Sequence, residues 1–143
     1  MNRAIAALLL AFGIACHAHA AEEYQRYALT VPMLEKHRAA TKEFEKTSKK
    51  KDDDDEGDKD GLTVDQLARK IDATPGAKPI LTRHGLTSRE YALVSVAFFQ
   101  AGFYLMMEPA MDKKKGAQLL ASYPAETRAN IELLRKNPQL MKQ

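Results

Sequence analysis

A long apolar run occupies residues 91–107 and dominates the hydrophobic pattern of the chain. Its sequence is YALVSVAFFQAGFYLMM, in which only Ser95, Gln100 and Gly102 interrupt the apolar residues and no residue is charged. A helix that is apolar on every side is either wrapped by other helices or crosses a membrane. The pattern therefore predicts one central helix, at about 87–108.

Local sequence patterns define where this central helix begins and ends. Thr87 and Glu90 have the spacing of a capping box, in which each side chain satisfies a backbone N–H of the other residue. Leu86 and Tyr91 occupy the two positions of a hydrophobic staple around that cap. Pro109 is expected to end the helix, because the residue before a proline avoids helical backbone angles.

A membrane-spanning helix is the alternative for this run. A crossing needs about 20 apolar residues, and residues 91–107 lie near the lower limit. The lysines at 113–115 would suit the flank of a membrane span. Against it, Gln100 lies at the centre of the run, and Glu90 and Glu108 lie at its ends. The sequence favours a buried central helix over a spanning one.

Apolar residues spaced by three or four positions predict further helices on both sides of the run. Thr63 with Gln66 forms a second capping box, and Ser122 is the expected N-cap of the last helix. Thr127, Ile131 and Leu134 form the inner stripe of that last helix. The expected helices cover about 31–48, 64–73, 77–84 and 124–136, with a polar connection at 108–116 and a short turn at 117–123. The fold class is thus all-α, a small helical bundle with a long charged loop.

The first twenty residues match a secretory signal peptide. Arg3 gives the positive start, residues 4–15 are apolar, and residues 18–20 are a small-residue cleavage site. Cleavage after Ala20 would leave one helical domain at 21–143 in the periplasm or outside the cell. A lipoprotein with acylated Cys16 is the alternative, but Gly13 stands where a leucine-like residue is expected.

Residues 49–60 read KKKDDDDEGDKD. They contain no apolar residue and predict a disordered, solvated loop. A calcium site is the competing hypothesis, because Glu56, Asp58 and Asp60 imitate the first ligands of an EF-hand. The match fails further on, where Gln66 or Leu67 occupies the position of the bidentate glutamate. The flexible loop is therefore the preferred interpretation, with no metal site.

Composition narrows the function classes. Cys16 is the only cysteine, so a mature chain would have no disulfide, thiolate metal site or cysteine nucleophile. The net formal charge of the whole chain is +3, which is too small to indicate a nucleic-acid partner. We find no nucleophile elbow, glycine-rich phosphate loop or zinc helix motif, and so predict no catalytic residues and no cofactor.

Two histidines of the expected mature chain were considered as ligands. His37 lies among apolar positions, and His84 lies in the last turn of a short helix, where it would favour the helix dipole. A b-type haem held by a histidine and one of Met33, Met106 or Met107 is conceivable. Methionines at helical spacing are usually core filler, and the structural interpretation is preferred for all of them.

Three stretches of the chain suggest relatives. They are YALTVPMLEKHRAAT, GLTSREYALVSVAFFQAG and PAETRANIELL, and together they resemble small secreted all-helical bacterial proteins of uncharacterised function. That resemblance implies an all-α secreted domain and brings no activity and no site residue. Leu62-Thr63-x-x-Gln66 also resembles the LTxxQ element of periplasmic helical chaperones, although the element is physically a capping box with a staple residue.

The function predicted from the sequence is that of a non-catalytic binding or interaction protein. Every specific pattern in residues 21–143 serves a helix start or core burial. Because the flanking helices are few and short, residues 91–107 are either fully covered or left partly exposed, and in the second case a homodimer or a client protein would supply the missing cover. A periplasmic chaperone of the LTxxQ type is the alternative.

Overall fold

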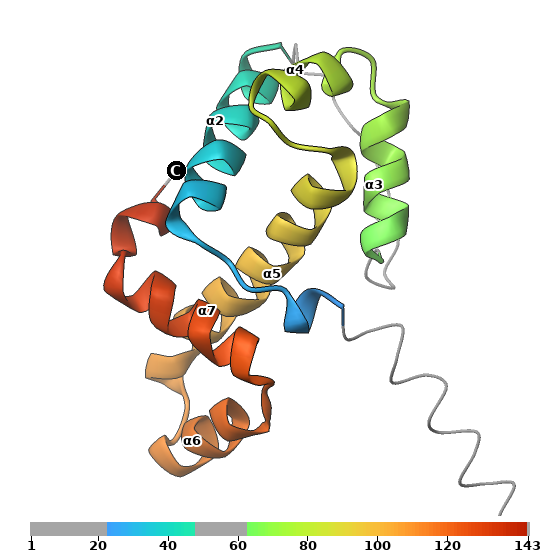
Figure 1. The fold of residues 1–143 in the computed structure, drawn as a ribbon. Helices are drawn as coiled ribbons and strands as arrows, with labels where there is room; N and C mark the ends of the chain where they lie inside the picture. The colour runs from blue at the N-terminus through green and yellow to red at the C-terminus, as the bar shows by residue number, and fades with distance from the viewer. Residues whose placement is uncertain (1–22, 48–62, 143) are drawn as a thin grey trace, which may run out of the picture.

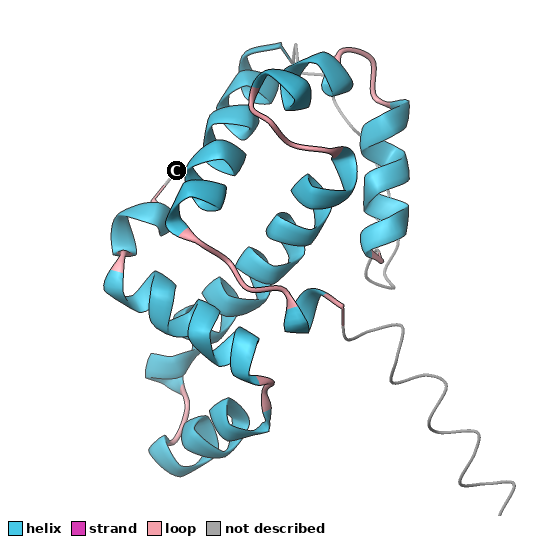
Figure 2. Ribbon diagram, in the orientation of Figure 1, coloured by secondary structure: helices cyan, strands magenta, loops and turns pink. Residues whose placement is uncertain are grey.

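The computed structural model describes residues 23–47 and 63–142, and all regular elements in these ranges are helical (Figures 1 and 2). The predicted all-α class is confirmed. The elements are η1 Tyr24–Arg26, α2 Val31–Thr47, α3 Val64–Ala73, α4 Ala77–Arg83, α5 Ser88–Met107, η2 Glu108–Ala110, α6 Lys113–Ser122, α7 Ala125–Lys136 and η3 Pro138–Met141.

Helix α5 is the centre of the bundle, as its apolar sequence predicted. Helices α2, α3 and α4 pack around its N-terminal half, and α7 packs along its C-terminal half (Figure 1). Val94, Ala97 and Ala101 of α5 are almost completely buried against Ile131 and Leu134 of α7. Small side chains on this face of α5 allow α7 to approach closely, which accounts for the tight contact between the two helices.

The two predicted capping boxes are both present. At the start of α5, the N–H of Glu90 donates to Thr87 Oγ1 at 3.1 Å, and the N–H of Thr87 donates to Glu90 Oε2 at 2.8 Å. At the start of α3, Gln66 and Thr63 make the same reciprocal pair at 3.2 and 2.8 Å. The glutamine of the LTxxQ element therefore satisfies a helix start in this protein.

The turn between α4 and α5 also follows the sequence. Gly85 has a φ of 65°, a left-handed conformation that favours glycine after a helix. Leu86 behind it is buried with Ile80 and Leu81. His84 lies at the end of α4 as expected, but its Nε2 is 2.8 Å from Oε2 of Glu43 on α2, so a side chain of another helix is its main partner.

Helix α6 corrects the prediction of a polar connection at 108–116. The helix begins at Lys113, because Oδ1 of Asp112 accepts the N–H groups of Lys114 at 2.8 Å and Lys115 at 3.4 Å. An N-cap aspartate of this kind satisfies donors that would otherwise be unpaired. Ser122 was wrongly predicted as the next N-cap: it is the last residue of α6, and its hydroxyl donates to the carbonyl of Leu119.

An extended segment at 27–30 precedes α2 and crosses α5 towards α7 (Figure 1). Asn130 of α7 binds this segment through both ends of its side-chain amide. The N–H of Leu29 donates to Oδ1, and Nδ2 donates to the carbonyl of Tyr27, both at 2.8 Å. One turn earlier, the hydroxyl of Thr127 donates to the carbonyl of Gln25 at 2.8 Å. We call Asn130 with its two backbone partners the Asn130 clamp.

Several sequence predictions lie outside the described residues. They concern the signal peptide at 1–20 with its cleavage after Ala20, the charged loop at 49–60, and the calcium candidates Glu56, Asp58 and Asp60.

Candidate functional site

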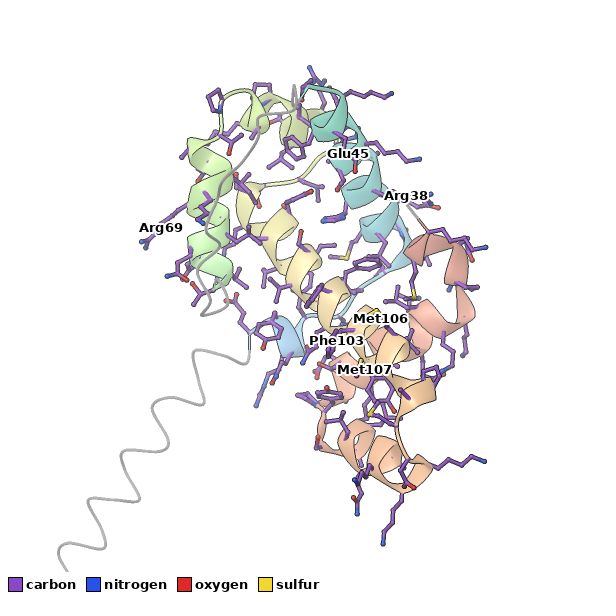
Figure 3. The ribbon with its side chains drawn as sticks, turned by 180° about the vertical axis from the view of Figure 1, so that it is seen from behind. Arg38, Glu45, Arg69, Phe103, Met106 and Met107 are labelled. Carbon is purple, nitrogen blue, oxygen red and sulfur yellow. The ribbon has the colours of Figure 1, made fainter. Side chains whose placement is uncertain are left out.

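Four large apolar side chains project into solvent from the C-terminal half of α5. Phe99 is 70% exposed, Met106 65%, Phe103 48% and Met107 40%. Their spacing places them on one face of the helix, and the rings of Phe99 and Phe103 stack with centroids 6.0 Å apart. Figure 3 shows Phe103, Met106 and Met107 together on the lower half of α5. These four residues are called the α5 strip.

The α5 strip shows that the central helix is not wrapped on all sides. Towards the N-terminus the same face of α5 is covered by α3, where Ala92 is completely buried and Val96 is partly buried. Helix α3 is only 10 residues long, whereas α5 has 20, so its cover ends before Phe99. An uncovered apolar face of this kind is typical of a surface that binds something else.

The length of α5 bears on the membrane alternative. Among the described residues, the segment Ser88–Ala110 is the one that is long and apolar enough to cross a membrane by length and composition. Core helices of soluble proteins pass the same test. Helix α5 packs against α3 and α7, and a spanning arrangement would require these contacts to be given up.

A second cluster lies where α2 crosses α5. Nε2 of His37 is 2.7 Å from Oγ of Ser95, and the imidazole stacks on the ring of Tyr91 with centroids 4.3 Å apart. The hydroxyl of Ser95 also contacts the carbonyl of Tyr91 at 2.8 Å. If Ser95 donates its single proton there, Nε2 of His37 carries the hydrogen that is shared with Ser95. Burial lowers the pKa of His37 to about 4.

The His37–Ser95 pair has the two residue types of a hydrolase but not their arrangement. A base with a pKa of about 4 removes a proton poorly at neutral pH. Ser95 lies inside helix α5 with its hydroxyl directed at a helical carbonyl, and no described carboxylate hydrogen-bonds the imidazole to orient it. The pair is better explained as a buried polar contact that fixes the crossing of α2 and α5.

His37 predicts a loss of stability on mild acidification. The pKa of a histidine is lower in this folded state than in an unfolded chain, so between about pH 6.5 and 4 the unfolded chain binds more protons. The free energy of unfolding should therefore fall by roughly 2 kcal/mol between pH 7 and pH 5. Urea unfolding at both pH values measures it.

The matched control is His84→Gln, which removes the other described histidine and should leave most of this pH dependence in place. His37→Gln should remove it. An unchanged pH dependence in the His37→Gln variant would show that other groups are responsible.

A groove runs along α2, with Phe98 of α5 and the last described residues as its other walls. Its cavity volume is about 90 Å³, and the space rises to about 560 Å³ when the open solvent at its mouth is included. The residues that line it, besides His37 and Thr41, are apolar or charged. The apolar ones are Leu34, Phe98, Leu140 and Met141, and the charged ones are Arg38, Lys42, Glu45 and Lys142. We call it the α2 groove.

The structure separates His37 from two of the three candidate haem methionines, and the third, Met33, lies one turn before His37 on α2 and packs against the core. His37 lies beside Ser95, whereas Met106 and Met107 are exposed at least eleven residues further along α5, or about 16 Å. His84 is engaged with Glu43. Within 23–47 and 63–142, no three side chains of His, Cys, Asp or Glu form a group that could hold a metal ion.

Sequence reasoning placed the α5 strip inside the apolar run but did not separate its exposed residues from its buried ones. The spacing of Phe99, Phe103 and Met106 shows that they share one face of α5. Whether that face is exposed depends on the length of the helix that covers it, which the spacing does not give. The α2 groove was missed. Its one local indication is the pair Arg38 and Lys42, four residues apart on α2 beside the buried Leu34.

No model of a known protein family, no curated protein and no solved structure matches the chain.

Proposed function

We propose that this chain is an exported, non-catalytic interaction protein, and that its α5 strip pairs with the same strip of a second copy. The observation that carries the proposal is the exposure of Phe99, Phe103, Met106 and Met107 on one face of a well-anchored helix. Burying one such side chain stabilises an association by up to about 1.5–3 kcal/mol.

The strip is self-complementary. Its N-terminal half is aromatic, Phe99 and Phe103, and its C-terminal half is sulfur-containing, Met106 and Met107. If two α5 helices pack antiparallel with the twofold axis at Phe103, each Phe99 meets the methionines of the other copy. Methionine sulfur against an aromatic ring is a favourable contact, and a twofold interface repeats it.

Charge does not oppose this pairing. No charged residue occurs in 91–107, so antiparallel strips bring no like charges together. Glu108, at the end of the strip, is already paired with Arg135, whose Nη2 is 2.7 Å from its Oε1. The strip is only about 12 Å long, from Phe99 to Met107, so we expect a dissociation constant in the micromolar range, on the order of 1–100 μM.

Contacts at both ends of α5 fix the position of the α5 strip on the surface. The capping box at Thr87 defines the start of the helix. Near its end, the buried hydroxyl of Tyr104 donates to the carbonyl of Gly116 on α6 at 3.1 Å. A helix held in this way loses little freedom on association, which favours binding. Export rests on the pattern of residues 1–20, which supports a place outside the cytoplasm.

The test is the mass of the purified protein in solution as a function of concentration. Sedimentation should show a monomer–dimer equilibrium in the micromolar range. Phe103→Asp should weaken dimerisation at least 100-fold, because it places two like charges at the twofold axis. Leu119→Asp, at an exposed leucine of α6, is the matched control and should leave dimerisation unchanged.

Other outcomes separate the alternatives. A monomer at 200 μM that suppresses aggregation of a chemically unfolded client, and loses this activity with Phe103→Asp, would contradict the dimer and support the chaperone-like function. A monomer without suppression would contradict both. Circular dichroism of each variant checks that the helical fold is retained.

A further inference from the structure

We propose that the α2 groove binds a single-chain amphiphile with an anionic head group, such as a fatty acid. The acyl chain would lie against Phe98, Leu34 and Met141, and the head group would lie at Arg38 and Lys42. This site is separate from the α5 strip: Phe98 and Phe99 are neighbours in sequence and therefore point about 100° apart around α5. The inference does not depend on dimerisation.

The apolar wall of the groove comes from three parts of the chain. Leu34 is supplied by α2, Phe98 by α5, and Leu140 with Met141 by the C-terminal segment. Met141 keeps 37% of its surface exposed, and Phe98 and Leu140 are partly buried. An acyl chain in the groove would cover apolar surface that now contacts water, which is the main source of affinity for such ligands.

The charge of the groove selects an anion. Arg38 and Lys42 lie one turn apart on the groove side of α2, Lys142 lies opposite, and Glu45 is the single acidic residue of the lining. Within the part of the chain that the structure describes, Arg38, Lys42 and Lys142 form no ion pair with a carboxylate. Three cations against one carboxylate complement a negative head group.

Arg38 is positioned for this role and retains unused donors. Its Nη1 donates to the carbonyl of Gln139 at 3.3 Å, which ties the guanidinium to the C-terminal wall of the groove. Its Nε is buried and has no hydrogen-bond partner among the described residues. Because Nε is closed to solvent, the Nη groups would contact the head group, and a carboxylate or phosphate matches their planar donors.

Direct binding tests the proposal. Calorimetric titration of the purified protein with decanoate, below its micelle concentration, should show one site per chain. Decyl phosphate should bind to the same site, and the ratio of the two affinities distinguishes a carboxylate from a phosphate head. Decyltrimethylammonium has the same chain and a positive head, and should bind at least tenfold more weakly than decanoate.

Variants locate the site. Arg38→Gln should weaken decanoate binding at least tenfold and decyltrimethylammonium binding little, whereas Phe98→Ala should weaken both. Arg69→Gln is the matched control: Figure 3 shows Arg69 on α3, on the opposite side of the molecule from Arg38. Lys42→Gln, at an exposed position, should weaken decanoate binding about threefold and serves if Arg38→Gln fails to fold.

The proposal is overturned by any of three results. Decanoate does not bind at millimolar concentration, or the cationic amphiphile binds as tightly as decanoate, or both Arg38→Gln and Lys42→Gln keep the affinity of the unmodified protein.

Discussion

Replacement of Asn130 by leucine is expected to lower the free energy of unfolding by about 3–5 kcal/mol. Leucine has the same branching and number of heavy atoms but can neither accept from the N–H of Leu29 nor donate to the carbonyl of Tyr27. Each buried backbone group left without a partner costs about 1–3 kcal/mol. Because Asn130 is 2% exposed, and the leucine would fill its space, water has little room to replace the lost bonds.

Urea unfolding measures the loss, and amide hydrogen exchange gives a local measure of it. The N–H of Leu29 should exchange slowly in the unmodified protein and near the rate of an open segment in Asn130→Leu. Arg128→Ala, an exposed change on the same helix, is the control and should alter stability by less than about 0.5 kcal/mol. Equal stability of Asn130→Leu and the unmodified protein would mean that the Asn130 clamp does not stabilise the fold.

Leu134→Ala is expected to cost about 3–4 kcal/mol. Leu134 is completely buried and packs in the cluster of Leu29, Val94, Ala101 and Ile131. Removing three carbon atoms from such a site costs the transfer free energy of the atoms and the energy of the cavity they leave. The loss of unfolding free energy should exceed the loss caused by protonation of His37. The helices on both sides of Leu134 limit how far the cavity can close.

The same substitution at an exposed position provides the control. Leu119→Ala on α6, where the leucine is 39% exposed, should change the free energy of unfolding by less than about 1 kcal/mol. Urea midpoints at constant slope would give both values. A cost for Leu134→Ala no larger than that for Leu119→Ala would contradict the packing of α7 against α5 described above.

Helix starts and stops were predictable because their causes are local. Thr87 with Glu90 and Thr63 with Gln66 act within four residues, and Gly85 acts alone. The start of α6 is equally local, in Asp112, but the run of lysines that follows it suggests a polar connection. A lysine run is compatible with a helix when an N-cap is present, since lysine has good helix propensity.

What surrounds each helix could not be predicted, because it depends on residues far apart in sequence. Nothing local indicates the role of Asn130, because its hydrogen-bond partners are more than 100 positions away in the sequence. The uncovered face of α5 depends on where α3 ends relative to Phe99. The α2 groove requires Phe98 and Met141 to approach Arg38, which no spacing within one helix indicates.

The Asn130 clamp also constrains the order in which parts of the chain can fold. During synthesis, residues 27–30 emerge early, and the side chain that satisfies their backbone emerges about a hundred residues later. Until α7 is available, this early segment has no stable place, and the buried surface of α5 that α7 covers stays open. The last long helix to be made therefore closes the fold. If the chain is exported, as proposed, this delay would keep it unfolded until synthesis is almost complete.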